Sequence, residues 1–246
     1  MKKIKEFLQG TGAKTAAIIF SILFSVGLVL TFLKGLSGFA QDPRPLAPFV
    51  AGLVFWLWIW HAYLRKSPRT MWHTWEHELT HALFCILTFT KVHGFHADEK
   101  SYKPEGSKST TAWAGHVSHA HVDGWRGALI TLAPYFFPTF TIILLLGRLI
   151  VSDSFQPVIE VMIGITFGYY VVNRYRDIRS AIRVARKDEA QEHDFQKHGV
   201  PFSLSFTVFA NLVIMPGIMI VLHQGWVAAG GYCVSGGRFW FDLLMG

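Results

Sequence analysis

The stretch TAAIIFSILFSVGLVLTFL, residues Thr15 to Leu33, contains no charged side chain. A helix needs about 20 apolar residues to cross a hydrocarbon core of about 30 Å, and this stretch has that length. Four more windows pass the same test with at most one ionisable group each: Leu46–Leu64, Gly127–Gly147, Ser154–Val172 and Val200–Leu222. A soluble helical bundle would instead show polar faces at helical spacing. The sequence therefore predicts an integral membrane protein.

The composition of the whole chain agrees with this class. The 246 residues are 51% hydrophobic and 16% charged, against roughly 25% charged in an ordinary soluble domain. Mean hydropathy is +0.33. A sixth apolar segment, Met71 to Thr90, is unusual because it contains HTWEHELTHALF, residues 73 to 84. Counting it, we expect an all-α membrane protein with about six transmembrane helices.

The net charge of +7 comes from basic clusters that lie beside the apolar windows. Clusters in these positions set topology and meet anionic headgroups, so we expect a lipid bilayer and no nucleic acid as partner. The strongest cluster, Arg174 to Lys187, is expected in the cytosol, and so is the polar insert Lys91 to Trp125. The segment Met71 to Thr90 must then either cross from outside or be re-entrant. If it crosses, Arg65 to Arg69 lies outside, against the positive-inside rule.

Two further sequence features limit the chemistry. Cys85 and Cys233 form no CxxC pair, so no thiolate metal site or disulfide framework is expected. Within the insert, Ser109–Trp113 and Gly115–Val122 are β-prone, and Pro104-Glu-Gly106 predicts a turn before them. We therefore expect a small β-prone insert after the histidine-rich helix.

His77, Glu78 and His81 form the pattern H-E-x-x-H. Positions i and i+4 share a helix face, so His77 and His81 can present two imidazole nitrogens to one metal ion. Zinc held by three protein ligands keeps a position for water and lowers its pKa to about 7, and Glu78 can then act as general base and acid. Charged groups at membrane depth cost roughly 2.5–3.5 kcal/mol on insertion scales, and such groups usually mark function.

These residues carry a resemblance to a known family. An HExxH helix, a β-prone insert and an apolar span that begins at Trp125-Arg-Gly resemble the site-2 protease superfamily of intramembrane zinc metalloproteases, in its compact bacterial branch. Thr80 stands where that branch usually has Gly, at a position expected to be a helix–helix contact. The resemblance covers about His73 to Leu222. It implies peptide-bond hydrolysis in a transmembrane protein substrate and the bacterial cytoplasmic membrane as location.

The resemblance also implies an organisation and a substrate-binding strand. We expect one polytopic domain over residues 1–246, with two N-terminal spans in 1–66, a metalloprotease-like core in 67–222 and a C-terminal tail in 223–246. The insert, 91–125, would lie inside the core. Gly115, His116 and Val117 resemble the family's Gly-x-Val/Thr strand, whose free edge can hold an unwound substrate segment. These three residues are the predicted substrate-binding residues.

The third zinc ligand in this family is an Asp on a later span. The usual N-x-x-P-x-x-x-L-D-G string is missing here. We predict Asp177, in Asn173-Arg-Tyr-Arg-Asp177, as this ligand. Asp194, in Glu192-His-Asp194 and seven residues before Pro201, resembles another stretch of the compact branch and is the alternative. Asp123 is a third candidate, although a turn Asp before Gly is its simpler interpretation.

Three other functions compete with the protease. A membrane di-iron oxygenase or desaturase would use His73, His77 and His81 with His116, His119 and His121, but an adjacent H-x-x-H-H pair is missing and Glu78 would have no role. An inactive protease relative could serve as a membrane scaffold. A transporter could use His61 and Glu160, yet the sequence shows no repeat. The sequence does not determine the substrate, the cleavage site or the oligomeric state.

Overall fold

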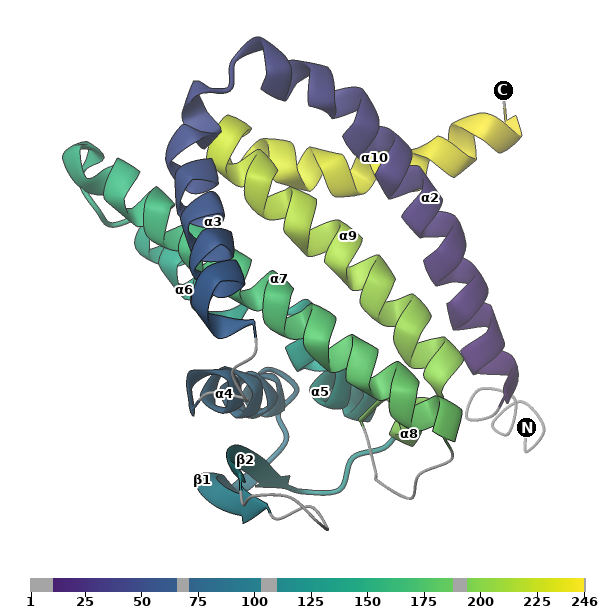
Figure 1. The fold of residues 1–246 in the computed structure, drawn as a ribbon. Helices are drawn as coiled ribbons and strands as arrows, with labels where there is room; N and C mark the ends of the chain where they lie inside the picture. The colour runs from purple at the N-terminus through teal and green to yellow at the C-terminus, as the bar shows by residue number, and fades with distance from the viewer. Residues whose placement is uncertain (1–10, 66–70, 103–109, 188–193, 246) are drawn as a thin grey trace. The chain divides into compact units, whose positions relative to one another are not determined.

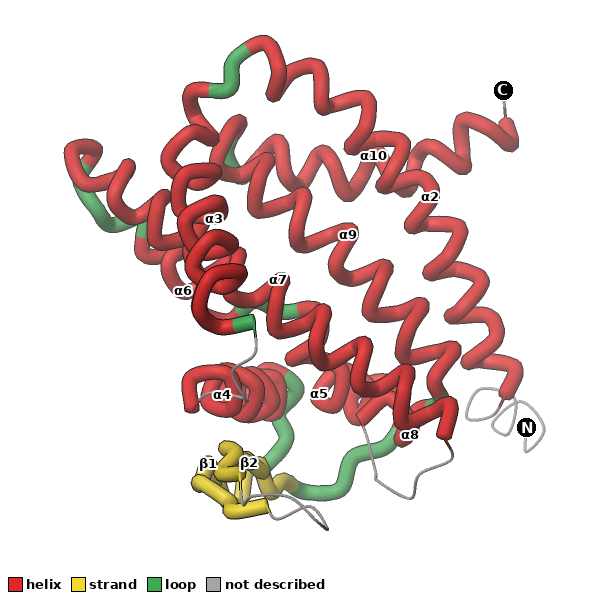
Figure 2. Tube along the Cα trace, viewed as in Figure 1, coloured by secondary structure: helices red, strands yellow, loops and turns green. Residues whose placement is uncertain are grey.

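The computed structural model describes residues 11–65, 71–102, 110–187 and 194–245 (Figure 1). Helices dominate, and the strands form one hairpin (Figure 2). In chain order the elements are α2 Thr11–Gln41, η1 Arg44–Leu46, α3 Ala47–Ile59, η2 Trp60–Leu64, α4 Met71–Leu87, β1 Val92–Tyr102, β2 Thr110–His119, α5 Gly124–Phe136, α6 Thr139–Gly147, η3 Asp153–Phe155, α7 Gln156–Lys187, α8 Asp194–His198, α9 Val200–Gln224 and α10 Trp226–Met245.

Four helical segments among the described residues are long and apolar enough to cross a membrane: Gly12–Gln41, Arg44–Leu64, Asp153–Ser180 and Val200–Gln224. The bent pair α5 and α6 adds a fifth if it is one span. The chain is therefore a multi-pass integral membrane protein, as the apolar windows predict. The histidine-rich helix α4 has 17 residues and is not one of these candidate spans.

The window Gly127–Gly147 does not form one straight helix. It is divided into α5 and α6, which meet at an angle of 79°. Pro138 has no N–H group, and proline disfavours the helical conformation at the residue before it. Phe137 accordingly has extended angles, φ −109° and ψ 109°. The break makes α5 a separate short helix beside α4, with which it packs.

The chain divides into two compact units, Met1–Val50 with Ile178–Gly246, and Ala51–Asp177. In the first, unit 1, α2, α9 and α10 pack around the buried side chains of Leu28, Ile220 and Tyr232. The Tyr232 hydroxyl lies 2.7 Å from the Leu212 carbonyl oxygen and 3.3 Å from that of Leu28, so one polar group joins three helices. The tail that the sequence left without an assignment is thus a packed helix.

The second unit, unit 2, carries the HExxH motif. Its α3 and α7 segments approach closely because glycines lie at their contact. A Cβ atom on Gly52 would lie 3.1 Å from the Ile165 nitrogen, and one on Gly168 would lie 3.0 Å from the Trp56 ring. Close approach at small residues is the usual way in which membrane helices pack.

Glu160, the carboxylate in the apolar window of α7, forms an ion pair within unit 2. Its Oε1 atom accepts from Arg148 Nε at 2.9 Å, and the Arg148 Nη2 atom is 2.8 Å away. Arg148 follows the last residue of α6, so the pair joins α6 to α7. A structural ion pair explains this intramembrane carboxylate without a transport function.

The insert forms an antiparallel hairpin of β1 and β2. The two β-prone stretches expected at 109–113 and 115–122 lie largely in β2, and the partner strand β1 comes from residues 92–102. The expected turn at Pro104-Glu-Gly106 lies outside the described residues. One face of the hairpin packs on α4, where the rings of Phe95 and Trp75 are 5.2 Å apart.

Arg126 fixes the junction that leads from α4 into the hairpin. Its Nη2 atom donates to the carbonyl oxygens of Thr88 and Phe89, the latter at 3.2 Å. These carbonyl groups lie just after α4, where the helix leaves unsatisfied acceptors and a partial negative charge. The Arg126 side chain, from the first turn of α5, therefore caps the C-terminal end of α4 and holds the two helices together.

Candidate metal centre

The α4 helix brings His77 and His81 onto one face, as their spacing predicts. Their ring centroids are 4.9 Å apart, with an angle of 73° between the ring planes. Both side chains are partly buried. Two imidazoles one helical turn apart can ligate the same metal ion.

His81 is oriented for this role by the backbone of α5. Its Nδ1 atom lies 2.7 Å from the Ile130 carbonyl oxygen. A carbonyl can only accept, so Nδ1 carries the proton and Nε2 keeps its lone pair. Metal-ligating histidines usually donate their second ring N–H in this way, and the donation fixes both tautomer and ring orientation. His81 therefore fits a metal ligand.

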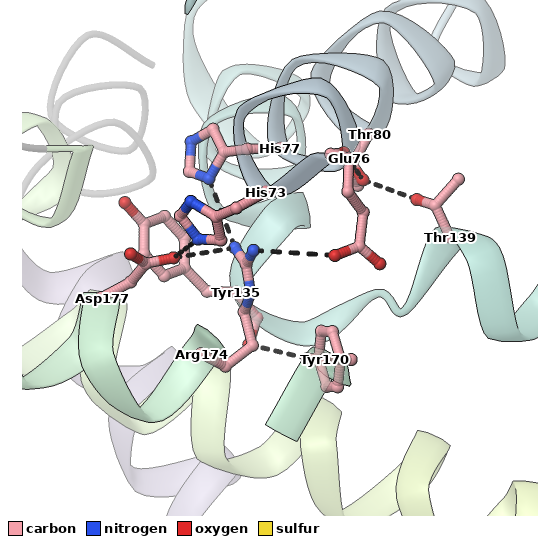
Figure 3. A network of polar contacts seen from close by, with 9 residues as sticks. All are labelled: His73, Glu76, His77, Thr80, Tyr135, Thr139, Tyr170, Arg174 and Asp177. Carbon is pink, nitrogen blue, oxygen red and sulfur yellow. Dashed lines mark hydrogen bonds and ion pairs between the residues drawn. The ribbon is translucent and has the colours of Figure 1, made fainter. Parts of the chain in front are cut away.

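His77 has a different environment. The Arg174 Nη1 atom lies 3.3 Å from His77 Nδ1, and the Tyr135 ring packs edge-on at 5.6 Å (Figure 3). A guanidinium can only donate, so His77 Nδ1 accepts in this arrangement and the proton lies on Nε2. Ligation through Nε2 requires that proton to move to Nδ1 and the Arg174 contact to open.

Glu78, the predicted general base, is 7% exposed and lies against the hairpin. A Cβ atom on Gly115 would come within 2.8 Å of Glu78 Cδ and Oε1. Only glycine leaves this space, so β2 passes directly over the carboxylate. The structure thus brings Gly115 and Glu78 together.

The other two predicted substrate-binding residues point to opposite faces of β2. Val117 is 6% exposed and lies on the face of the hairpin that packs on α4. His116 is exposed on the other face. Alternation along a strand requires this separation, so the three residues can share a strand edge but not one surface.

Four charged or ionisable side chains form a buried network between α4 and α7 (Figure 3). Asp177 Oδ2 lies 3.1 Å from His73 Nε2 and 3.2 Å from Arg174 Nη1. Arg174 Nη2 is 3.9 Å from Glu76 Oε2, and its guanidinium stands 5.7 Å from the centre of the Tyr170 ring. Asp177, the predicted third ligand, is therefore engaged by His73 and Arg174 in this arrangement.

Sequence reasoning missed this network. Arg174 was expected to belong to a cluster of cations beside the membrane, yet Arg174, His73 and Glu76 are all at most 5% exposed. Burial raises the pKa of the Glu76 carboxyl to about 7, and the Arg174 charge opposes that rise. A usable signal was the i, i+3 spacing of Arg174 and Asp177 at the end of an apolar window.

Thr80, which stands where the compact branch has glycine, makes the expected helix contact. Its hydroxyl lies 2.6 Å from the Glu76 carbonyl oxygen and 2.5 Å from the Thr139 hydroxyl at the start of α6. Both threonines are at most 2% exposed. A pair of hydroxyl groups therefore joins α4 to α6 beside the histidines.

The remaining aspartates differ in their surroundings. Asp123 is an exposed residue that precedes α5 and lies 3.1 Å from His121, as suits a turn residue before Gly124. Asp194 is the first residue of α8 in unit 1, and its carboxylate lies 3.1 Å from the Lys197 Nζ atom. The Ser203 hydroxyl of α9 donates to the Phe195 carbonyl oxygen and so holds α8 to α9. Among the described residues of unit 2, no three His, Cys, Asp or Glu side chains bring their ligand atoms together.

The second histidine group does not join the first in the described part of unit 2. His119 Nδ1 lies 2.8 Å from the Ala120 carbonyl oxygen, His121 pairs with Asp123, and His116 is exposed. A di-iron centre needs ligands from both groups around one site. This arrangement offers no support for it.

Comparison with protein-family models, curated proteins and solved structures finds no match to this chain.

Proposed function

We propose that the chain is an intramembrane zinc metalloprotease that hydrolyses a peptide bond in or near a membrane-spanning segment of a protein substrate. The observation that carries the proposal is the position of Glu78, which lies against Gly115 of β2 and next to His77 on α4. A general base, two imidazoles and a strand beside them are the parts that peptide hydrolysis by an HExxH site needs.

In this proposal His77 and His81 supply two zinc ligands, and His81 is already in the tautomer that ligation requires. The third ligand remains the predicted Asp177, and Asp194 and Asp123 are the alternatives that the sequence offers. Ligation by Asp177 would compete with the contacts to His73 and Arg174, at 3.1 and 3.2 Å, that hold it at the α4–α7 junction. Asp123 is exposed and paired with His121, which makes it the weakest of the three.

Bound zinc would supply a Lewis acid that polarises a carbonyl group and lowers the pKa of water. Glu78 takes the proton of the attacking water and delivers it to the nitrogen of the leaving amine. Its burial beneath β2 keeps the carboxylate in place. The residues of β2 would hold an unwound substrate segment in extended form along the strand edge.

The location follows from the same proposal. Cleavage within a bilayer requires α4 to reach membrane depth, either as a sixth span or as a helix that enters without crossing. The family resemblance favours the bacterial cytoplasmic membrane. A substrate in the same bilayer would approach the site laterally.

The direct test uses the detergent-purified chain and labelled peptides that each carry one membrane-spanning segment with a central helix-breaking residue. Wild type is expected to cleave such a peptide, and Glu78→Gln is expected to lose at least about 100-fold in rate, the lower end of general acid–base contributions. Both should contain the same amount of zinc. Glu76→Gln is the matched control, because Glu76 is a buried carboxyl two residues away that faces Arg174.

The outcome against the proposal is also specific. Equal cleavage by wild type and Glu78→Gln would exclude Glu78 as the base. A zinc-loaded wild type that cleaves no peptide in the series would favour the scaffold function.

A further inference from the structure

The outer face of the hairpin carries two histidines directly opposite each other. His96 of β1 is paired with His116 of β2 in the antiparallel register. Both side chains are exposed. Among the described residues, neither ring has a hydrogen-bonding or ionic partner. This pair is distinct from the α4 histidines and has no part in the proposed hydrolysis.

The packing of the other face determines where these rings lie. Phe95 contacts Trp75 of α4, Gly115 lies over Glu78, and Val117 is buried. Successive side chains of a strand alternate between faces, so His96 and His116 must share the face that points away from α4. A slip of one residue in the register would bury both imidazoles, which makes the outward placement well determined.

Two imidazoles at directly opposite positions can chelate one cation. Residues directly opposite in an antiparallel pair have Cβ atoms about 4.5–5.5 Å apart. Metal–nitrogen distances of about 2.0–2.1 Å then let one cation reach both rings. Imidazole suits zinc, copper and nickel. Asp98 lies two residues along β1 on the same exposed face and adds a negative charge nearby.

We propose that His96 and His116 form a second metal site, for a divalent transition cation such as Zn²⁺ or Cu²⁺, with water completing the coordination. The neighbouring histidines are arranged differently. His119 is bonded to the Ala120 carbonyl group, His121 pairs with Asp123, and His93 lies at the register irregularity between Val92 and Gly94. A cation that bridges β1 and β2 binds only while the strands are paired, so it stabilises the hairpin whose inner face covers Glu78.

The test is zinc titration by calorimetry on the full chain without a histidine tag. The chain carries His77→Ala and His81→Ala so that the α4 histidines contribute nothing. We expect this protein to bind zinc in one saturable step, and we expect His96→Asn or His116→Asn to abolish that step. Copper titrated in place of zinc should give a nitrogen-ligated paramagnetic resonance spectrum that disappears in the same two variants.

Matched controls come from the same hairpin. His93→Asn and His121→Asn are exposed substitutions at histidines without an opposite partner, and both should keep the saturable step. Circular dichroism checks that all variants are folded. The proposal is overturned if the parent protein binds no zinc, or if the step survives in both His96→Asn and His116→Asn.

Discussion

Gly115 determines how closely β2 can approach α4. Every other residue type would place a Cβ atom into the Glu78 side chain. The HExxH spacing predicts which residues face a metal, because i and i+4 periodicity is a local property of a helix. The contact between Glu78 and Gly115 depends on the register of β2 against a helix about thirty residues earlier in the chain, and no local pattern contains that information.

Substitution of Gly115 by alanine should therefore move β2 or Glu78. We expect a loss of about 1–3 kcal/mol in the free energy of unfolding, the usual cost of overpacking a close contact. The measurement is thermal denaturation in detergent, monitored by circular dichroism. Gly94→Ala is the control, because its added Cβ would meet the end of the His96 ring at 3.3 Å, which can turn aside. The free energy of unfolding of Gly94→Ala should change by no more than about 0.5 kcal/mol. Equal losses in both variants would contradict a specific close contact between Gly115 and Glu78.

The burial of charged residues at the ends of apolar windows is also not predictable from the sequence. Arg174 and Asp177 belong to a basic run that resembles a cytosolic membrane-surface cluster, yet both are buried. Their burial depends on His73 and Glu76, which lie about a hundred residues earlier. Only the three-dimensional pairing of α4 with α7 distinguishes these two from their exposed neighbours such as Arg179.

Among the elements, the apolar windows predicted most helix positions, since a spanning helix leaves its signature in one continuous stretch. The break at Pro138 could have been anticipated from proline chemistry, but its angle of 79° depends on the packing of α5 and α6. The α10 helix was missed because its four glycines resemble loop composition. Two of these, Gly236 and Gly237, instead lie against the side chains of Leu28 and Phe24.

The crossing of α2 and α10 in unit 1 yields a prediction at this scale. A Cβ atom on Gly236 would lie 2.6 Å from Leu28 Cδ2, and Leu28 is fully buried. Gly236→Ala should therefore destabilise unit 1 by about 1–3 kcal/mol. Gly230→Ala, in the same helix, meets nothing within 4 Å and should gain up to about 1 kcal/mol from helix propensity. Thermal denaturation of the two variants checks this, and a stabilised Gly236→Ala would show that the helices do not cross closely there.

For the whole molecule, the lengths of the helices allow a topology that satisfies the positive-inside rule, which a spanning Met71–Thr90 segment would violate. If α4 does not cross and α5 with α6 counts as one bent span, the chain crosses five times. The clusters at Lys2–Lys5, Arg65–Arg69 and Arg174–Lys187 then all fall on the cytosolic side, as the positive-inside rule requires. The sequence alone could not show this, because the apolar character of Met71–Thr90 suggested another span.

Single-cysteine labelling tests this topology. With Cys85 and Cys233 replaced by serine, Arg65→Cys and Asp98→Cys place one thiol on each side of α4 along the chain. Both thiols should be protected from an impermeant maleimide in intact cells and should react after permeabilisation. Labelling of only one of them from outside would mean that α4 crosses the membrane.

The zinc content of the purified chain tests the central claim most directly. Samples of wild type, His81→Ala, Asp194→Asn and Asp177→Asn are dialysed against a weak chelator, which strips the outer histidine pair, and are analysed by mass spectrometry of the metals. We predict about one zinc per chain in wild type and loss of zinc in His81→Ala and Asp177→Asn. Asp177→Asn should also lose roughly 3–5 kcal/mol of stability, because the substitution breaks a buried ion pair. Zinc kept in Asp177→Asn but lost in Asp194→Asn would move the third ligand to Asp194. A wild type without zinc, or with paired iron, would contradict the metalloprotease.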